Sequence, residues 1–163
     1  MRHEDRGFDV DGFLARAVAP SLAPAISAAG AYAILLAGLD SLPTVVPGKH
    51  GLLYVGMTDQ GLDARNHFLH ADSGFSTLRR SLGALLKEAL NLKAIPRGPG
   101  SSKSNVQNYR FTDEGERALT EWMKGHLLLT QVAIETDLTV FEDDLIALLE
   151  PPAQPQGLVE SSA

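Results

Sequence analysis

Two tyrosines stand beside small residues on consecutive apolar runs. Tyr32 lies two residues after Gly30, and Tyr54 lies two residues before Gly56. A phenolate can act as a base, but an unperturbed tyrosine titrates at about 10, so a neighbouring arginine or metal ion would have to stabilise the anion. The alternative is that both tyrosines are core residues whose hydroxyls bond to an interior acceptor.

Arg65, His67 and His70 follow on a segment, residues 61–70, that we expect to form a short helix. Guanidinium is a permanent bidentate donor and imidazole can relay a proton at neutral pH, so these residues suit phosphate recognition. His67 and His70 would share a helical face and could act as a metal pair. An ordinary surface helix is the alternative.

Glu142 lies on the last expected helix, which begins at Asp137 or Thr139 and ends at Leu149. At roughly 100° per residue it falls inside the apolar arc of this helix, whereas Asp143 and Asp144 point away. A buried carboxylate is costly without a partner, so Glu142 needs a cation, a metal or a set of donors. The alternative is a capping box in which Glu142 reaches back to the amide of Thr139.

The composition limits the kinds of protein that this chain can be. Its 163 residues are 44% hydrophobic and 21% charged, which is typical of one soluble domain. The absence of cysteine excludes disulfide frameworks, thiolate metal sites and cysteine nucleophiles. We expect no membrane span and no signal peptide, and therefore a cytoplasmic protein. Nothing in the sequence indicates the oligomeric state.

Charge is segregated along the chain. The formal net charge is −6, yet residues 65–110 hold eight basic and two acidic residues, a local balance of +6 that leaves −12 for the rest. Such a segment fits a surface that faces phosphates, with Arg79, Arg80, Arg97 and Lys103 as expected nucleic-acid contacts. An ordinary solvated face is the alternative.

Apolar periodicity predicts an α+β domain. The expected elements are one broken or two short helices in residues 8–29, hairpin strands at 30–38 and 52–56 with an enlarged connection, the helix at 61–70, a helix that begins at Ser76, a basic loop at 96–104, a strand near 108–111, a helix from Asp113, a strand at 127–134 and the final helix. The helix after Ser76 has an apolar stripe of Leu78, Leu82, Leu85 and Ala89, with Arg79 and Arg80 off it. Asp113 and Glu116 resemble a capping box.

The order of these motifs resembles that of the GIY-YIG nuclease family. The matching residues are Gly30-Ala31-Tyr32, then Tyr54-Val55-Gly56, then Arg65 with His67 and His70, then Glu142 in Phe-Glu-Asp-Asp-Leu-Ile, and Pro151-Pro152. The likeness covers residues 30–154. The first tripeptide has alanine where the family has isoleucine, the connection between the tyrosines is longer than usual, and Gln154 stands where many members have asparagine.

The resemblance implies a small three-stranded antiparallel sheet flanked by helices, completed by residues 127–134. It also implies a metal-dependent endonuclease that hydrolyses DNA phosphodiester bonds. In this reaction Tyr54 would act as the base or position the attacking water, with Tyr32 supporting it, and Arg65 would hold the scissile phosphate.

By the same resemblance, Glu142 would be the single protein ligand of Mg²⁺, or of another divalent cation such as Mn²⁺. His67 or His70 would assist proton transfer. A non-catalytic module that keeps the fold to bind nucleic acid or protein is the rival hypothesis, since fold does not fix activity. A small-molecule enzyme is a third possibility that no phosphate-binding glycine loop or nucleophile motif favours.

The expected organisation has three parts. Residues 1–29 form an N-terminal helical extension, residues 30–152 the GIY-YIG-like catalytic domain with a basic insertion around residues 90–124, and residues 153–163 a disordered tail.

Overall fold

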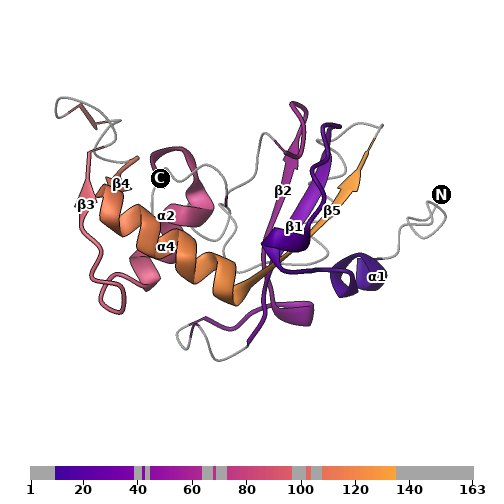
Figure 1. Ribbon diagram of the computed structural model, residues 1–163, viewed down its shortest axis with the longest axis horizontal. Coiled ribbons are helices and arrows are strands. Elements are labelled where there is room, and N and C mark those ends of the chain that lie inside the picture. Colours follow the sequence, from indigo (N-terminus) through magenta and orange to yellow (C-terminus); the bar gives the residue numbers. More distant parts are fainter. Residues whose placement is uncertain are drawn as a thin grey trace.

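The computed structural model describes residues 10–38, 42, 45–63, 68, 73–96, 102–103 and 108–134. Helices and strands are mixed along the chain in an α+β arrangement (Figure 1). The elements are α1 (Val10–Ala15), a 3-10 helix at Pro20–Leu22, β1 (Gly30–Leu36), a 3-10 helix at Lys49–Gly51, β2 (Leu52–Thr58), a 3-10 helix at Ser73–Phe75, α2 (Thr77–Leu85), β3 (Ala94–Ile95), β4 (Arg110–Phe111), α4 (Asp113–His126) and β5 (Leu127–Ala133).

The main sheet has three antiparallel strands in the order β2-β1-β5. This confirms the hairpin and the third strand that the sequence predicts, although β2 continues to Thr58, two residues beyond the expected end. The central strand β1 is buried along its whole length, as its continuous apolar run requires.

Each face of the sheet packs against its own helices. Tyr32 and Ile34 belong to a cluster shared with α2 and α4, whereas Ala31, Ala33 and Leu35 belong to a second cluster that includes two residues of α1. The two sets alternate along β1 because successive side chains of a strand point to opposite faces. Figure 1 accordingly shows α2 and α4 on one side of the sheet and α1 on the other.

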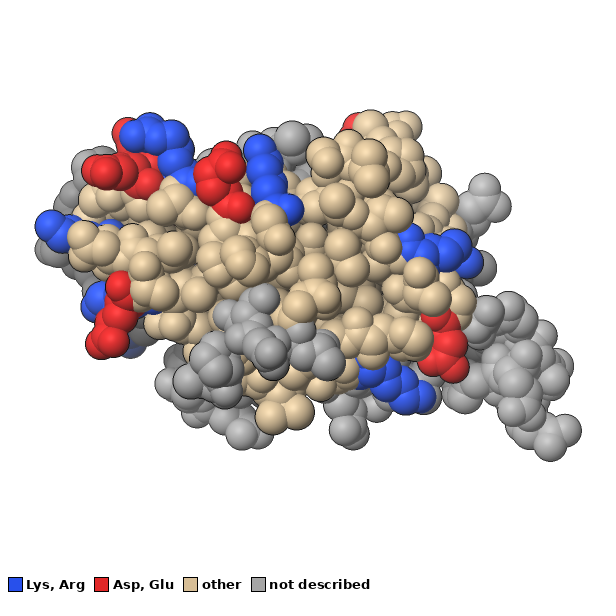
Figure 2. Space-filling view, turned by 60° about the horizontal axis from the view of Figure 1, so that its bottom comes forward, with Lys and Arg blue, Asp and Glu red and all other residues tan. Residues whose placement is uncertain are grey.

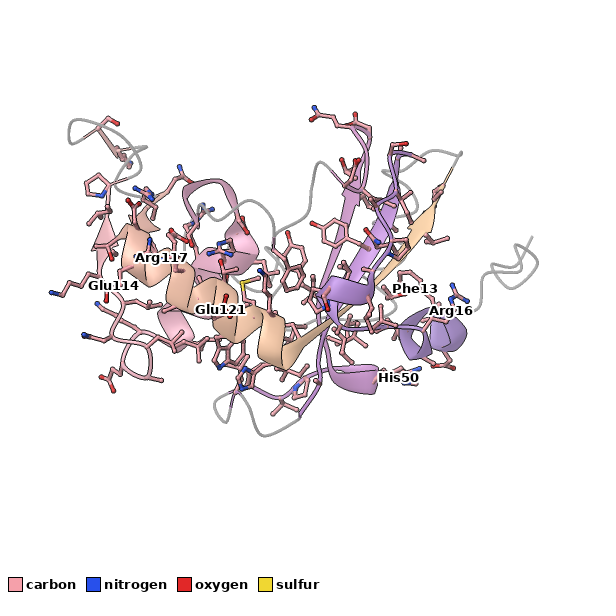
Figure 3. The ribbon with its side chains drawn as sticks, viewed as in Figure 1. Phe13, Arg16, His50, Glu114, Arg117 and Glu121 are labelled. Carbon is pink, nitrogen blue, oxygen red and sulfur yellow. The ribbon has the colours of Figure 1, made fainter. Side chains whose placement is uncertain are left out.

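The two longer helices begin at hydroxyl N-caps. Ser76 accepts a hydrogen bond from the backbone N of Arg79 (3.1 Å), and Thr112 accepts one from the backbone N of Gly115 (3.1 Å). The expected start at Ser76 is confirmed. The capping box that begins at Asp113 is wrong, because Thr112 is the cap and Glu116 is engaged elsewhere. The outer side of α4 carries Glu114, Arg117 and Glu121 (Figure 3).

A two-stranded ribbon, β3 with β4, lies against α2. The strand near Phe111 was expected, but its partner Ala94 was not. Phe111 is fully buried over Gly83, where a Cβ would collide with the aromatic ring. The apolar stripe predicted for this helix is therefore wrong at Leu85, which is 45% exposed, because the helix turns Gly83 toward the ribbon instead. It is also wrong at Ala89, which is exposed and lies beyond the end of α2.

Two expected helices fall mainly or wholly outside the described residues. Of the helix expected at 61–70, the structure describes residues 61–63 and Phe68. The helix at 137–149 and the tail that follows it lie entirely outside the described part.

Candidate functional site

The two tyrosines lie side by side on neighbouring strands. Tyr32 is paired with Gly56 across the β1–β2 ladder and Tyr54 with Ile34, so both phenols project from the same face of the sheet. Their ring centroids are 6.2 Å apart and the rings are inclined by 27°. The long connection between the strands therefore does not separate the phenols.

Gly56 makes this arrangement possible. A Cβ at this position would collide with the ring and hydroxyl of Tyr32, which cross directly over the backbone of β2. Any larger residue would have to move Tyr32, so the glycine of the second tripeptide positions the tyrosine of the first.

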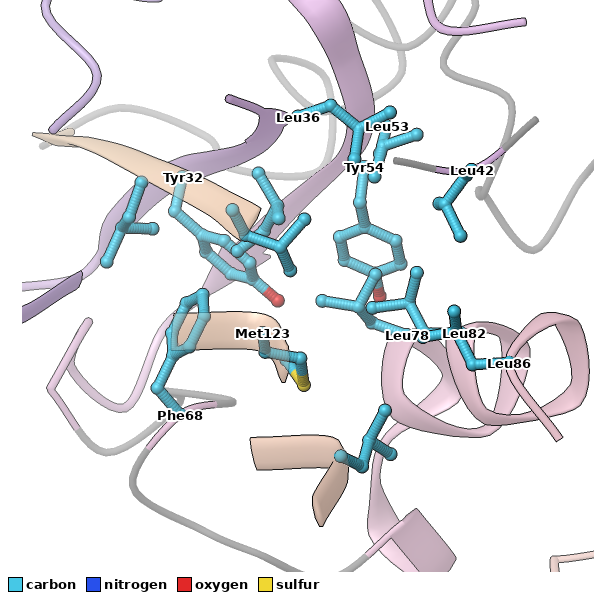
Figure 4. Packing of buried hydrophobic residues seen from close by; sticks show 14 of the residues in the cluster. Tyr32, Leu36, Leu42, Leu53, Tyr54, Phe68, Leu78, Leu82, Leu86 and Met123 are labelled. Atoms are coloured by element: carbon cyan, nitrogen blue, oxygen red, sulfur yellow. The ribbon is translucent and has the colours of Figure 1, made fainter. Parts of the chain in front are cut away.

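Both phenols lie in the buried core. Tyr32 and Tyr54 are only 4% and 5% exposed. In Figure 4 the hydroxyl of Tyr54 points toward Leu78 and Leu82 of α2, and that of Tyr32 points toward Met123 of α4. The site of the phenols is thus the layer between the sheet and these two helices.

The charged residues expected around the phenols are not among the described residues. Arg65, His67, His70 and Glu142 all fall in undescribed stretches, so their roles remain predictions. The described Phe68, which lies between Arg65 and His70 in sequence, is buried in the same cluster as the tyrosines and lies beside Tyr32 in Figure 4.

Arg79 is buried inside the fold, contrary to the expectation that it contacts nucleic acid. Its side chain is completely buried, and Nη2 lies 2.9 Å from Oε1 of Glu116, itself 2% exposed. Nη2 also donates to the backbone O of Glu116 (3.1 Å), and Nη1 contacts Sδ of Met123 (3.5 Å). A guanidinium held in this way has no surface to offer a phosphate.

Sequence reasoning placed Glu116 in a capping box and missed both its burial and its partner Ser73. The carboxylate of Glu116 accepts hydrogen bonds from the hydroxyl of Ser73 (2.8 Å), the backbone N of Ser73 (3.1 Å) and the backbone N of Phe111 (2.8 Å), besides that from Arg79. A signal was present: Glu116 lies on the same helical face as the buried Leu119 and Met123, so it falls inside the apolar arc of α4.

The other expected nucleic-acid contacts differ in their surroundings. Arg80 is partly buried, and its Nη1 donates to the backbone O of Ser73 (2.8 Å) and of Gly74 (3.0 Å). Lys103 is exposed, and Arg97 lies outside the described residues. On the face drawn in Figure 2, basic and acidic side chains alternate and the basic ones form no continuous patch.

Tyr109 is the third tyrosine of the chain, and it packs beside α2. Its hydroxyl donates to the backbone O of Arg80 (3.4 Å). Burial raises the pKa of Tyr109 above its ordinary value, and the nearby charge of Arg80 opposes part of this effect. Tyr109 therefore favours its neutral form, which suits a packing role.

The described residues offer no alternative metal site. No three His, Asp or Glu side chains converge among them. Both carboxylate oxygens of Glu116 already accept two hydrogen bonds each, which uses the lone pairs that a cation would need. A single carboxylate such as Glu142 is a sufficient protein ligand for Mg²⁺, which usually keeps several waters.

Comparison with known proteins gives one match. The family model described as GIY-YIG catalytic domain matches residues 33–156, a range that includes Tyr54, Arg65 and Glu142 and begins one residue after Tyr32. No curated protein and no solved structure matches the chain. Among the described helices, none has the length and apolar character needed to cross a membrane.

Proposed function

The chain belongs to the GIY-YIG catalytic-domain family, a family of nucleases, and on this basis we propose that it is a metal-dependent endonuclease that hydrolyses DNA phosphodiester bonds. The observation that carries the proposal is the pairing of Tyr32 with Tyr54 on one sheet face, with Gly56 giving the first ring its place. The family resemblance places the attacking water beside these two tyrosines.

The proposed reaction uses few side chains. Tyr54 accepts a proton from the attacking water or positions that water, and Tyr32 supports Tyr54 through the adjacent ring. Arg65 holds the scissile phosphate and stabilises the charge that develops on it. His67 or His70 assists proton transfer to the leaving oxygen.

Glu142 is the proposed protein ligand of the divalent cation, Mg²⁺ or Mn²⁺. The cation, when bound, supplies Lewis-acid stabilisation of charge at the phosphate. Glu116, a buried carboxylate among the described residues, is not available for this role, because protein donors occupy both of its oxygens.

Backbone contacts to DNA are assigned to Arg80, Arg97 and Lys103. Lys103 is exposed, and Arg80 is only partly buried. These contacts supply affinity that depends on salt and carry no base specificity, so the proposal names no target sequence.

Plasmid cleavage tests the proposal. The wild-type protein, Tyr54→Phe and Glu142→Ala are incubated with supercoiled DNA in the presence of Mg²⁺ and, separately, with EDTA. We expect nicking by the wild type with Mg²⁺ only, and a loss of at least about 100-fold in each variant, the scale of removing one general base or electrostatic group. Equal cleavage by Glu142→Ala and the wild type would reject the metal-ligand role.

A non-catalytic module that binds nucleic acid or protein is the second candidate. The burial of both phenols, at 4% and 5% exposure, favours it, because buried tyrosines on strands are commonly core residues whose hydroxyl bonds to an interior acceptor. This candidate predicts binding that is indifferent to Mg²⁺ and no cleavage of DNA by the wild type. A magnesium titration of DNA affinity alongside the plasmid assay therefore separates the two candidates.

A further inference from the structure

Met123 of α4 connects the first tyrosine of the candidate site to a buried cation. Its side chain is completely buried in the same cluster as Tyr32, and the hydroxyl of Tyr32 points toward it in Figure 4. At the same time, Sδ of Met123 accepts a hydrogen bond from Nη1 of Arg79 (3.5 Å). One side chain therefore adjoins both the guanidinium and the phenol.

The guanidinium of Arg79 is held in a single orientation. Nη2 donates to Oε1 (2.9 Å) and to the backbone O (3.1 Å) of Glu116, and the backbone N of Arg79 donates to Oγ of Ser76 at the start of α2 (3.1 Å). Because a guanidinium is planar and rigid, the two bonds at Nη2 also fix the direction in which Nη1 points. That direction leads to the sulfur of Met123.

A methionine needs such an anchor if it is to hold a neighbouring side chain in place. It has three rotatable bonds and adapts to irregular gaps, so apolar packing alone leaves it several arrangements. A thioether is a weak acceptor, but a charged donor strengthens the hydrogen bond and gives it a direction. The bond from Arg79 therefore selects one arrangement of Met123 among those that the core would accept.

The ring of Tyr32 is confined from two sides. A Cβ at Gly56 would collide with the ring and hydroxyl, so the backbone of β2 blocks movement of the ring in that direction. Met123 lies at the hydroxyl end, on a helix that packs against the same face of the sheet (Figure 4). The position of the Tyr32 ring beside Tyr54, with centroids 6.2 Å apart, thus depends on the strand and on the methionine.

Stability alone is a weak reason for a cation at position 79. A buried ion pair can often be replaced by apolar residues of similar volume without loss of stability, because desolvation of the two charges offsets their attraction. An apolar residue could pack against Met123, but it could not direct the sulfur, since only a hydrogen bond has a preferred angle. A role in geometry therefore explains the buried arginine better than a role in stability.

We propose that Arg79 is a positioning residue: by binding Sδ of Met123 it fixes the side chain that bounds the hydroxyl of Tyr32, and so sets the place of this phenol beside Tyr54. The catalytic role of the two tyrosines rests on the proposed function, whereas the positioning of Tyr32 by Arg79 does not. Arg79 touches neither DNA nor the reacting atoms in this proposal.

Fluorine NMR of the full chain labelled with 3-fluorotyrosine tests the positioning, because the three tyrosines give three signals that Tyr→Phe variants assign. Arg79→Lys keeps a positive charge opposite Glu116, but a single ammonium cannot present a rigid fork to both Glu116 and Met123. We expect the Tyr32 signal to move and to broaden in this variant. The control is Arg117→Lys, the same change at an exposed position of α4 (Figure 3), which should leave the Tyr32 signal unchanged.

A double-mutant cycle tests whether Arg79 acts through Met123. Met123→Leu removes the sulfur acceptor at nearly constant volume and leaves the ion pair intact. If the methionine carries the effect, Arg79→Lys should change the Tyr32 signal in the wild-type background and add little in the Met123→Leu background. Should Arg79→Lys fail to fold, Met123→Leu alone carries the test, and an unchanged Tyr32 signal in it would overturn the inference.

Plasmid cleavage by the unlabelled proteins tests the catalytic consequence. We expect Arg79→Lys and Met123→Leu each to lower kcat about tenfold with KM within about twofold of the wild type, because misplacement of a catalytic group acts in the transition state. The double variant should also lose about tenfold, not the roughly 100-fold product of independent effects, and Arg117→Lys should behave as wild type.

The outcomes separate the two proposals. An unchanged Tyr32 signal in folded Arg79→Lys would overturn the inference, as would a change of equal size in the Met123→Leu background or an altered signal with an unchanged kcat. A wild-type protein that does not cleave DNA would overturn the proposed function, while the fluorine signals would still decide whether Arg79 positions Tyr32.

Discussion

Breaking the buried ion pair between Arg79 and Glu116 should destabilise the fold far more than breaking a surface pair of the same length. Removal of one partner from a buried pair typically costs about 3–5 kcal/mol, because the other charge stays in the interior without compensation. Glu116→Gln should reach the upper end of this range. It leaves the guanidinium uncompensated and turns an amide NH₂ toward donors that previously faced a carboxylate oxygen.

Arg79→Met should cost less than Glu116→Gln. The carboxylate would keep the three hydrogen bonds from Ser73 and Phe111, so its negative charge remains solvated by protein donors. The double variant should cost less than the sum of the single variants by at least about 2 kcal/mol, since it removes both charges together.

Urea unfolding followed by the fluorescence of Trp122, the only tryptophan, measures these free energies. The control is Asp113→Asn, which breaks a pair with Arg110 of the same length, 2.9 Å, but with the aspartate side chain 83% exposed. An exposed pair is worth at most about 1 kcal/mol. The reasoning is refuted if Glu116→Gln costs no more than Asp113→Asn, or if the costs of the two single variants simply add.

Three further predictions concern single side chains. Gly56→Ala should lower the free energy of unfolding in urea by about 1–3 kcal/mol and reduce cleavage, because its Cβ would displace the ring of Tyr32. The control Gly125→Ala should be neutral or stabilising, because nothing lies within 4 Å of a Cβ there. Equal costs for the two variants would contradict this account. Tyr109→Phe should reduce the loss of stability at alkaline pH. Because the pKa of Tyr109 is raised in the folded protein, the unfolded chain loses the phenol proton first, and the free energy of unfolding of the wild type falls as pH rises above about 10. An unaltered pH profile in the variant would contradict this prediction. Lys103→Ala should weaken DNA binding modestly and lower the slope of log affinity against log salt by about 1, and an unchanged slope would remove Lys103 from the interface.

The sheet could be predicted from sequence because its signal is local. Each of its strands, β1, β2 and β5, is a short apolar run that can be recognised in the sequence. The antiparallel pairing of β1 with β2 follows from their adjacency along the chain. The partner strand β3 has only two residues, Ala94 and Ile95, which is too short to show a period.

The buried polar cluster of Ser73, Arg79 and Glu116 could not be deduced from the charges of its residues, because a charged side chain is by default expected at the surface. Arg79 was assigned to the surface as one basic residue among eight, yet it is fully buried. The test of the apolar arc that singled out Glu142 applies equally to Glu116 and would have flagged it. The periodicity of a single helix does not show that Arg79 and Glu116 form an ion pair, because 37 residues separate them and they lie on different helices.

The face of the sheet that packs against α1 limits how far the chain can be truncated at its N-terminus. Phe13 and Leu14 of α1 cover Ala31, Ala33 and Leu35, and the family match begins only at residue 33. A fragment that begins at residue 33 would lack the first residues of the central strand β1, and without α1 it would expose the apolar face of the sheet to solvent. Recombinant fragments designed on homology alone should therefore be prone to self-association, whereas those that retain residues from 10 onward should stay dispersed.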